Sequence, residues 1–151
     1  MMKETYTVQF KLISEYNLVV QKHIGLVELN KLIHLTEILC AKEEVTAKKN
    51  FLIDLRASKF SKDIAKVKDF VFFLRENFPA ILTNKLALLA DESDQVAMAT
   101  LFKMYQPGVA RNIHIFSSLE YAFLWLNIEM SNSDLEELIR CAKTIEYPEY
   151  K

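Results

Sequence analysis

Glycine is scarce in this chain of 151 residues, which contains only Gly25 and Gly108. An average composition would supply about ten glycines. Glycine-rich phosphate loops, the dinucleotide-binding fingerprint and the nucleophile elbow all need glycines at fixed spacings, so these motifs are excluded. Most nucleotide-dependent enzymes are excluded with them.

An excess of charge of one sign and long apolar runs are also lacking. Nineteen Lys and Arg residues face twenty Asp and Glu residues, a net charge of −1, so we expect no general positive field to attract nucleic acid or an anionic membrane. The longest apolar stretches, such as Val71–Leu74, are far shorter than the roughly 20 residues that span a bilayer. Polar residues recur through Met1–Leu12, which is not the pattern of a signal peptide. We therefore expect a cytoplasmic protein without a nucleic-acid partner or a membrane segment.

Cysteine and histidine are too dispersed for a metal centre. Cys40 and Cys141 lack Cys-x-x-Cys spacing, and each lies in an apolar helical pattern, which predicts small buried thiols in a reducing compartment. His23, His34 and His114 contain no His-x-x-x-His pair. We predict no metal, no cofactor and no catalytic motif; the sequence leaves open only a catalytic triad assembled in space.

Hydrophobic periodicity predicts an α/β fold. Residues 5–12 alternate between apolar and polar side chains, and Leu18–Val20 starts a second extended run after turn residues, which predicts an N-terminal antiparallel hairpin. A helical pattern follows, and then three short apolar runs, each with a helix after it, predict parallel strand-helix units. These runs are Phe51–Leu55, Leu86–Ala90 and Ile113–Phe116, and the helical patterns cover 26–41, 64–78, 96–105 and 119–126. A last helix is expected over 134–143.

Four segments of the sequence together carry a resemblance to a known family. They are Ile53–Arg56, Leu86–Asp91, Ala97–Tyr105 and Ile115–Leu126. The last is the most specific, because a strand ending in phenylalanine, a capping box of Ser117 and Glu120, and an Ala-x-x-Trp-Leu helix occur in one segment. In these residues and in the order of its elements the chain resembles the SpoIIAA-like (STAS) family, and most of all its small stand-alone bacterial branch.

The resemblance implies a ββαβαβαβα domain over residues 1–130, with a C-terminal helical extension of the same domain over 131–151. It also implies a non-enzymatic domain, since family members bind partner proteins and relatives of the same general fold carry lipids or other small apolar molecules. In the sporulation antagonists a serine after the third strand is phosphorylated within an Asp-Ser-Ser/Thr-Gly-like motif. The equivalent stretch, Phe60–Ile64, has no glycine, and Ser61 corresponds to that serine only in a shifted alignment.

The carboxyl ends of the parallel strands are the predicted binding region. Loops that begin near Arg56, Asp91 and Ser117 should meet there. The first loop is expected to place hydroxyl and cationic groups at a helix N-terminus, which favours an anion such as phosphate or carboxylate. The alternative is that Ser61 only caps the helix while the lysines are solvated. The candidate binding residues are Arg56, Ser58, Lys59, Ser61, Lys62, Asp63, Asp91, Ser93 and Ser117.

Two further groups near these loops have structural interpretations. Asp54 and Arg56 are two apart on a strand and so share a face, which predicts an ion pair. Asp91, Glu92 and Asp94 lack a calcium-loop pattern, so capping of the helix that starts near Gln95 is favoured over a metal cluster or an acid-base pair.

The helices carry more apolar surface than one sheet-facing stripe can bury. The candidate interface residues are Phe72, Phe73, Phe123 and Trp125. Three explanations remain open: cover by the C-terminal helix, a homodimer seam, or a cavity for an apolar ligand.

These observations predict a non-enzymatic regulatory or protein-interaction module that binds an unknown protein partner through the rim of loops. The alternative is a carrier or sensor of a small apolar or acidic ligand, bound between sheet and helices with Arg56 or Lys59 at its polar end. An enzyme is the third hypothesis.

Overall fold

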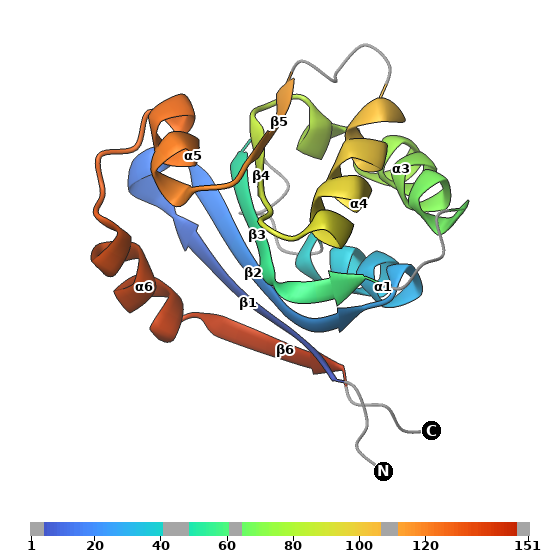
Figure 1. Ribbon diagram of the computed structural model, residues 1–151, viewed down its shortest axis with the longest axis horizontal. Helices are drawn as coiled ribbons and strands as arrows, with labels where there is room; N and C mark the ends of the chain where they lie inside the picture. Colours follow the sequence, from blue (N-terminus) through green and yellow to red (C-terminus); the bar gives the residue numbers. More distant parts are fainter. Residues whose placement is uncertain (1–4, 41–48, 61–64, 107–111, 148–151) are drawn as a thin grey trace.

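The computed structural model describes residues 5–40, 49–60, 65–106 and 112–147. Helices pack on both faces of a six-stranded sheet with the order β5-β4-β3-β2-β1-β6 (Figure 1). The strands are β1 (Tyr6–Ile13), β2 (Leu18–Val27), β3 (Asn50–Phe60), β4 (Leu86–Leu89), β5 (Ile113–Phe116) and β6 (Lys143–Tyr147). The helices are α1 (Leu29–Cys40), α3 (Ala65–Asn77), α4 (Ser93–Met104), α5 (Leu119–Leu126) and α6 (Asn132–Arg140), with 3₁₀ turns η1 (Ser14–Tyr16) and η2 (Pro79–Leu82).

The expected α/β topology is confirmed. β1 and β2 form the antiparallel hairpin, and β2, β3, β4 and β5 are parallel neighbours. The hairpin turn closes at Asn17, which has a φ of +52° and donates its backbone N–H to the carbonyl of Ser14. Asparagine is one of the few residues that adopt this left-handed conformation readily.

The C-terminal segment differs from its prediction. The last helix ends at Arg140, and residues 143–147 form β6, which pairs antiparallel with β1 from Tyr6↔Tyr147 to Phe10↔Lys143. The extension over 131–151 is therefore not wholly helical. β-branched and aromatic residues favour a strand here, and β6 supplies the hydrogen-bonding partner that the outer edge of β1 requires.

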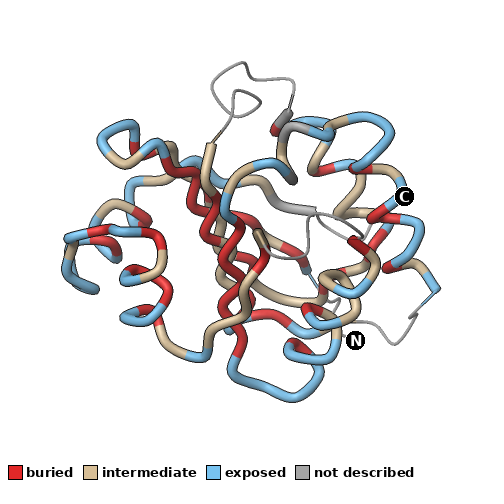
Figure 2. Tube along the Cα trace, turned by 90° about the horizontal axis from the view of Figure 1, so that it is seen from above, coloured by how far each residue is buried: buried red, intermediate tan, exposed pale blue. Residues whose placement is uncertain are grey.

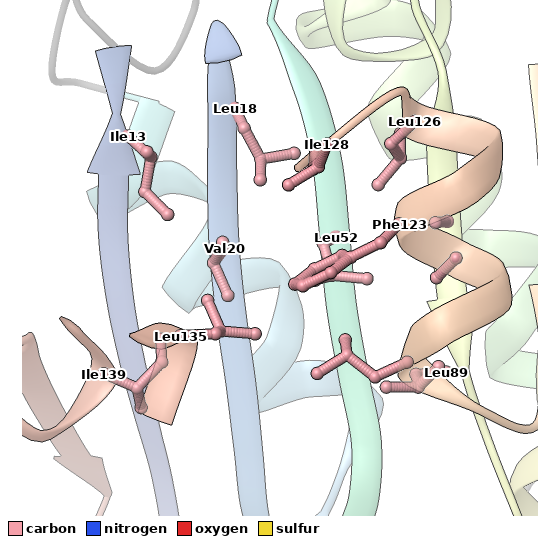
Figure 3. Close-up of a cluster of buried hydrophobic side chains, with 13 residues drawn as sticks. Ile13, Leu18, Val20, Leu52, Leu89, Phe123, Leu126, Ile128, Leu135 and Ile139 are labelled. Atoms are coloured by element: carbon pink, nitrogen blue, oxygen red, sulfur yellow. The ribbon is translucent and has the colours of Figure 1, made fainter. Parts of the chain in front are cut away.

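Two apolar cores hold the helices on the sheet, and the buried residues gather along the central strands (Figure 2). On one face, α5 and α6 cover β2, β3 and β4. There Phe123 extends from α5 over Leu52, and Leu135 and Ile139 approach from α6 (Figure 3). On the other face, side chains of α1, α3 and α4 form clusters that also include strand residues and η2.

β3 is longer than its apolar run predicts. It continues to Phe60, so Arg56, Ser58 and Lys59 lie in a strand; their expected place at a helix N-terminus is wrong. The pairing of β2 with β3 shifts between Lys22↔Asp54 and Ile24↔Ala57, so β3 bulges here. A bulge changes which face the following side chains point to.

Candidate functional site

The three predicted rim segments do meet at one end of the sheet. Arg56 lies in β3, and Asp91 and Ser117 follow the carboxyl ends of β4 and β5. The backbone N–H of Ala90 donates to the carbonyl of Phe116 over 2.9 Å, which holds the last two segments together.

Gln95, a residue that sequence reasoning treated only as part of a helix start, organises this rim. Its side chain is buried, and Oε1 accepts the backbone N–H groups of Asp91 and Glu92 at 3.0 and 3.1 Å. Its Nε2 donates to the carbonyls of Arg56 and Ser58 at 3.2 and 2.8 Å. Two donors and two acceptors satisfy the carboxamide completely. One side chain therefore ties the start of α4 to the bulge of β3.

Arg56 and Asp54 form the expected ion pair. Nε and Nη2 of Arg56 donate to the two carboxylate oxygens of Asp54, each over 3.0 Å. These hydrogen bonds raise the pKa of Arg56 above its ordinary value, while partial burial acts against them. The negative charges of Asp91 and Glu136 add to the increase.

The charge balance does not favour an anion at this rim. Its described cations are Arg56, already paired, and the exposed Lys59. The nearby carboxylates are more numerous, namely Asp54, Asp91, Glu92 and Asp94. Asp94 serves a structural contact, because its Oδ2 accepts the backbone N–H of Phe60. Within the described ranges no three His, Cys, Asp or Glu side chains lie together as a metal site.

The remaining rim candidates are Ser58, Ser61, Lys62, Asp63, Ser93 and Ser117. Ser58 is buried and its hydroxyl donates to the carbonyl of Leu55 over 2.6 Å, whereas Ser93 and Ser117 are exposed. Ser118, one residue later than expected, caps α5 by accepting the backbone N–H of Tyr121. Ser61, Lys62 and Asp63 lie outside the described residues.

The candidate interface residues have different environments. Phe72 is 61% exposed, whereas Phe73 is half-buried against Phe78. Phe123 is a core residue of its own chain. Trp125 is half-buried and stacks on His114 with ring centroids 4.4 Å apart.

Of the three explanations for the excess apolar surface, cover by the C-terminal helix holds for part of α5 and not for α3, where Phe72 stays exposed. Leu135 and Ile139 of α6 belong to the same core cluster as Phe123. Cys141, which follows this helix, is exposed, so its predicted burial is wrong. The helix ends one residue earlier than Cys141, which removes that thiol from the apolar stripe.

An apolar pocket lies between the sheet and helices α1, α3 and α4. Its volume is about 110 Å³, and β2, β3, β4 and η2 contribute lining residues beside the three helices. Among the described residues that line it, only Gln21, His23 and Thr36 are polar. Arg56 and Lys59 do not line it, so neither can serve as the polar end that the ligand-carrier hypothesis expected.

His23 is the buried polar group of this pocket. Its Nδ1 is 2.5 Å from the hydroxyl of Tyr6, and its Nε2 is 2.9 Å from Oε1 of Gln21. Burial lowers the pKa of His23 to about 4, against the smaller opposing effect of the Asp54 charge. The imidazole is therefore neutral at pH 7. Sequence reasoning missed this group, although the alternation of Val19, Gln21 and His23 places all three on one face of β2.

None of the helices in the described parts of the chain combines the length and apolar composition needed to span a bilayer.

Comparisons with known proteins agree with the fold. No family model and no curated protein matches the sequence. Among solved structures, an uncharacterized protein of the DUF3478 family with a SpoIIAA-like fold, from Shewanella loihica PV-4, aligns with a TM-score of 0.54 and 15% sequence identity. The alignment covers 83% of this chain and 98% of that chain. This likeness, together with the strand order and the helices on both faces, shows that the chain has the SpoIIAA-like fold that its sequence predicts.

Proposed function

We propose that this protein is a non-catalytic binding module whose ligand is a small, uncharged, apolar molecule held between the sheet and helices α1, α3 and α4. The observation that carries the proposal is the apolar pocket of about 110 Å³. An engineered cavity of roughly 150 Å³ lined by apolar side chains stays dry and binds benzene, and this pocket is about a quarter smaller, so it takes a molecule of about six carbon atoms at most.

The pocket favours occupation by an apolar molecule for energetic reasons. Atoms that line an unfilled pocket lack dispersion contacts on one side. At about 24 cal/mol per Å³ for an enclosed cavity, a pocket of about 110 Å³ corresponds to at most roughly 3 kcal/mol of lost stability. A ligand of matching shape restores part of these contacts.

The lining also selects against charged molecules. Among the residues that the structure describes, no Asp, Glu, Lys or Arg lines the pocket, and the histidine that does is neutral at pH 7. Transfer of an ionised carboxylate or ammonium group into such surroundings without a partner is strongly unfavourable. The acidic ligand considered from the sequence is therefore disfavoured, and a neutral one is proposed.

Benzene is the probe that tests this proposal, with Ala99→Leu as the variant that fills the pocket. Ala99 is buried on α4 and lines the pocket, whereas Ala97 on the same helix is exposed. We expect benzene to shift the backbone amide resonances of pocket residues and to raise the melting temperature. Ala99→Leu should abolish both effects, and the matched variant Ala97→Leu should retain them. Resonances that do not move up to the aqueous solubility of benzene would exclude the proposed function.

Regulatory protein binding at the rim is a second candidate function. It is supported by the meeting of the rim segments and by β3, which contributes Leu55 to the pocket and Arg56 to the rim. Arg56→Glu would place two carboxylates side by side at the rim. The immobilised wild-type protein and the control variant Lys68→Glu should retain a partner from a cell extract. The variant Arg56→Glu should not retain it. Equal retention by all three proteins would remove the rim from consideration.

A further inference from the structure

Two polar groups of the pocket lie together at one side of it, where Nε2 of His23 is 2.9 Å from Oε1 of Gln21. Gln21 and His23 are two residues apart on β2, and Thr36 is on α1. Leu35 and Leu39 of α1 pack in one cluster with Val27 of β2, so this helix covers the strand that carries the two polar residues. The other described residues of the lining are apolar. The pocket therefore has an apolar body and one polar end.

The direction of each hydrogen bond at this end follows from the chemistry of the groups. An amide oxygen only accepts, so the hydrogen of the neutral His23 imidazole must be on Nε2, which donates to Oε1 of Gln21. Nδ1 then accepts the hydroxyl hydrogen of Tyr6. Both ring nitrogens are occupied, and Tyr6 and His23 hold the Gln21 carboxamide in one orientation.

What this end offers a ligand is a hydrogen-bond donor. Oε1 of Gln21 already accepts from His23, and among the described residues no hydrogen bond uses its Nε2. The hydroxyl of Thr36 directs its hydrogen to the carbonyl of Leu32 over 2.8 Å and so does not donate into the pocket. The carboxamide N–H groups of Gln21 are thus the donors that remain.

We propose that the ligand carries an uncharged carbonyl oxygen, as in a ketone, aldehyde or ester, which accepts a hydrogen bond from Nε2 of Gln21 while its apolar body fills the pocket. This inference rests on the proposed function. Gln21 is the residue that contacts the ligand, and His23 and Tyr6 are positioning residues that act through it.

Two probes of nearly the same shape test the inference. Cyclopentanone has a C=O group where methylenecyclopentane has a C=CH₂ group, so only the first can accept a hydrogen bond. In ¹H–¹⁵N spectra of the wild-type protein, cyclopentanone should move the side-chain NH₂ resonance of Gln21, and methylenecyclopentane should not move it downfield. This measurement needs no substitution beyond the one that assigns the resonance.

The matched variants are Gln21→Met, which keeps the length of the side chain without its amide, and Gln9→Met on β1 outside the pocket lining. A neutral hydrogen bond has a net value that corresponds to about a three- to tenfold change in affinity. Gln21→Met should weaken cyclopentanone binding by that factor and leave methylenecyclopentane binding within twofold. Gln9→Met should change neither.

The outcomes separate this inference from the proposed function. Binding of methylenecyclopentane together with unchanged cyclopentanone affinity in Gln21→Met, or no cyclopentanone binding at all, overturns the carbonyl proposal alone. Failure of benzene to move the pocket resonances overturns the proposed function and this inference with it.

Discussion

Protonation of His23 should make the stability of this protein depend on pH. Burial lowers the pKa of His23 to about 4 in the folded protein, from 6.5 in an unfolded chain. Below pH 6.5 the unfolded state therefore binds a proton that the folded state does not bind, and the free energy of unfolding falls with pH. The stabilisation is fully present above pH 6.5 and is lost progressively as pH falls toward 4.

The size of the effect follows from the two pKa values. A pKa difference of one unit corresponds to about 1.4 kcal/mol, so the loss is about 3 kcal/mol in all. About 2 kcal/mol of it develops between pH 7 and pH 5, above the range in which exposed carboxylates titrate.

Urea unfolding at a series of pH values measures this loss. His23→Gln preserves groups that can accept from Tyr6 and donate to Gln21 but removes the titrating ring. This variant should lose most of the slope between pH 7 and pH 5, whereas His34→Gln, at an exposed position of α1, should keep it. A wild-type slope close to zero, or the same slope in His23→Gln, would refute the reasoning.

Two other substitutions test the rim and the hairpin. Gln95→Ala leaves four backbone groups without their side-chain partner. Urea unfolding should show a free energy of unfolding lower by about 2–4 kcal/mol, and Val96→Ala at the neighbouring position serves as the control. A loss below about 1 kcal/mol would show that water replaces these contacts. Gly25 has a φ of +97°, and a Cβ built there would lie 2.0 Å from the carbonyl oxygen of Thr5. Gly25→Ala should therefore destabilise the protein by at least about 2 kcal/mol in thermal or urea unfolding, and an unchanged midpoint would mean that β1 moves to make room.

Elements with a strong local pattern could be predicted from the sequence residue by residue. β5 and α5 have the bounds that the apolar run Ile113–Phe116 and the helical pattern 119–126 predict. β4 is buried at all four positions, as a continuous apolar run between helices should be. The ion pair of Asp54 and Arg56 could also be predicted, because residues two apart on one strand share a face of the sheet.

Elements that depend on partners distant in the sequence could not be predicted from their own residues. The second half of β3 is polar, and it is a strand because its backbone pairs with Ile24–Val27 of β2. β6 is a strand because β1 offers it an open edge. Neither pairing leaves a local period in the sequence that distinguishes it from a loop or a frayed helix.

The sequence by itself determined the α/β class, the hairpin, the parallel direction of the central strands and the lack of glycine-dependent nucleotide motifs, because each follows from local periodicity or composition. The tertiary structure alone decided where the polar side chains of those elements meet. It buried Gln95 between the start of α4 and the bulge of β3. It also linked the uncharged side chains of Tyr6, His23 and Gln21 by hydrogen bonds at the side of an apolar pocket. Such contacts depend on strand register and on the packing of helices over the sheet, which join residues far apart in the chain and so leave no spacing by which to recognise them.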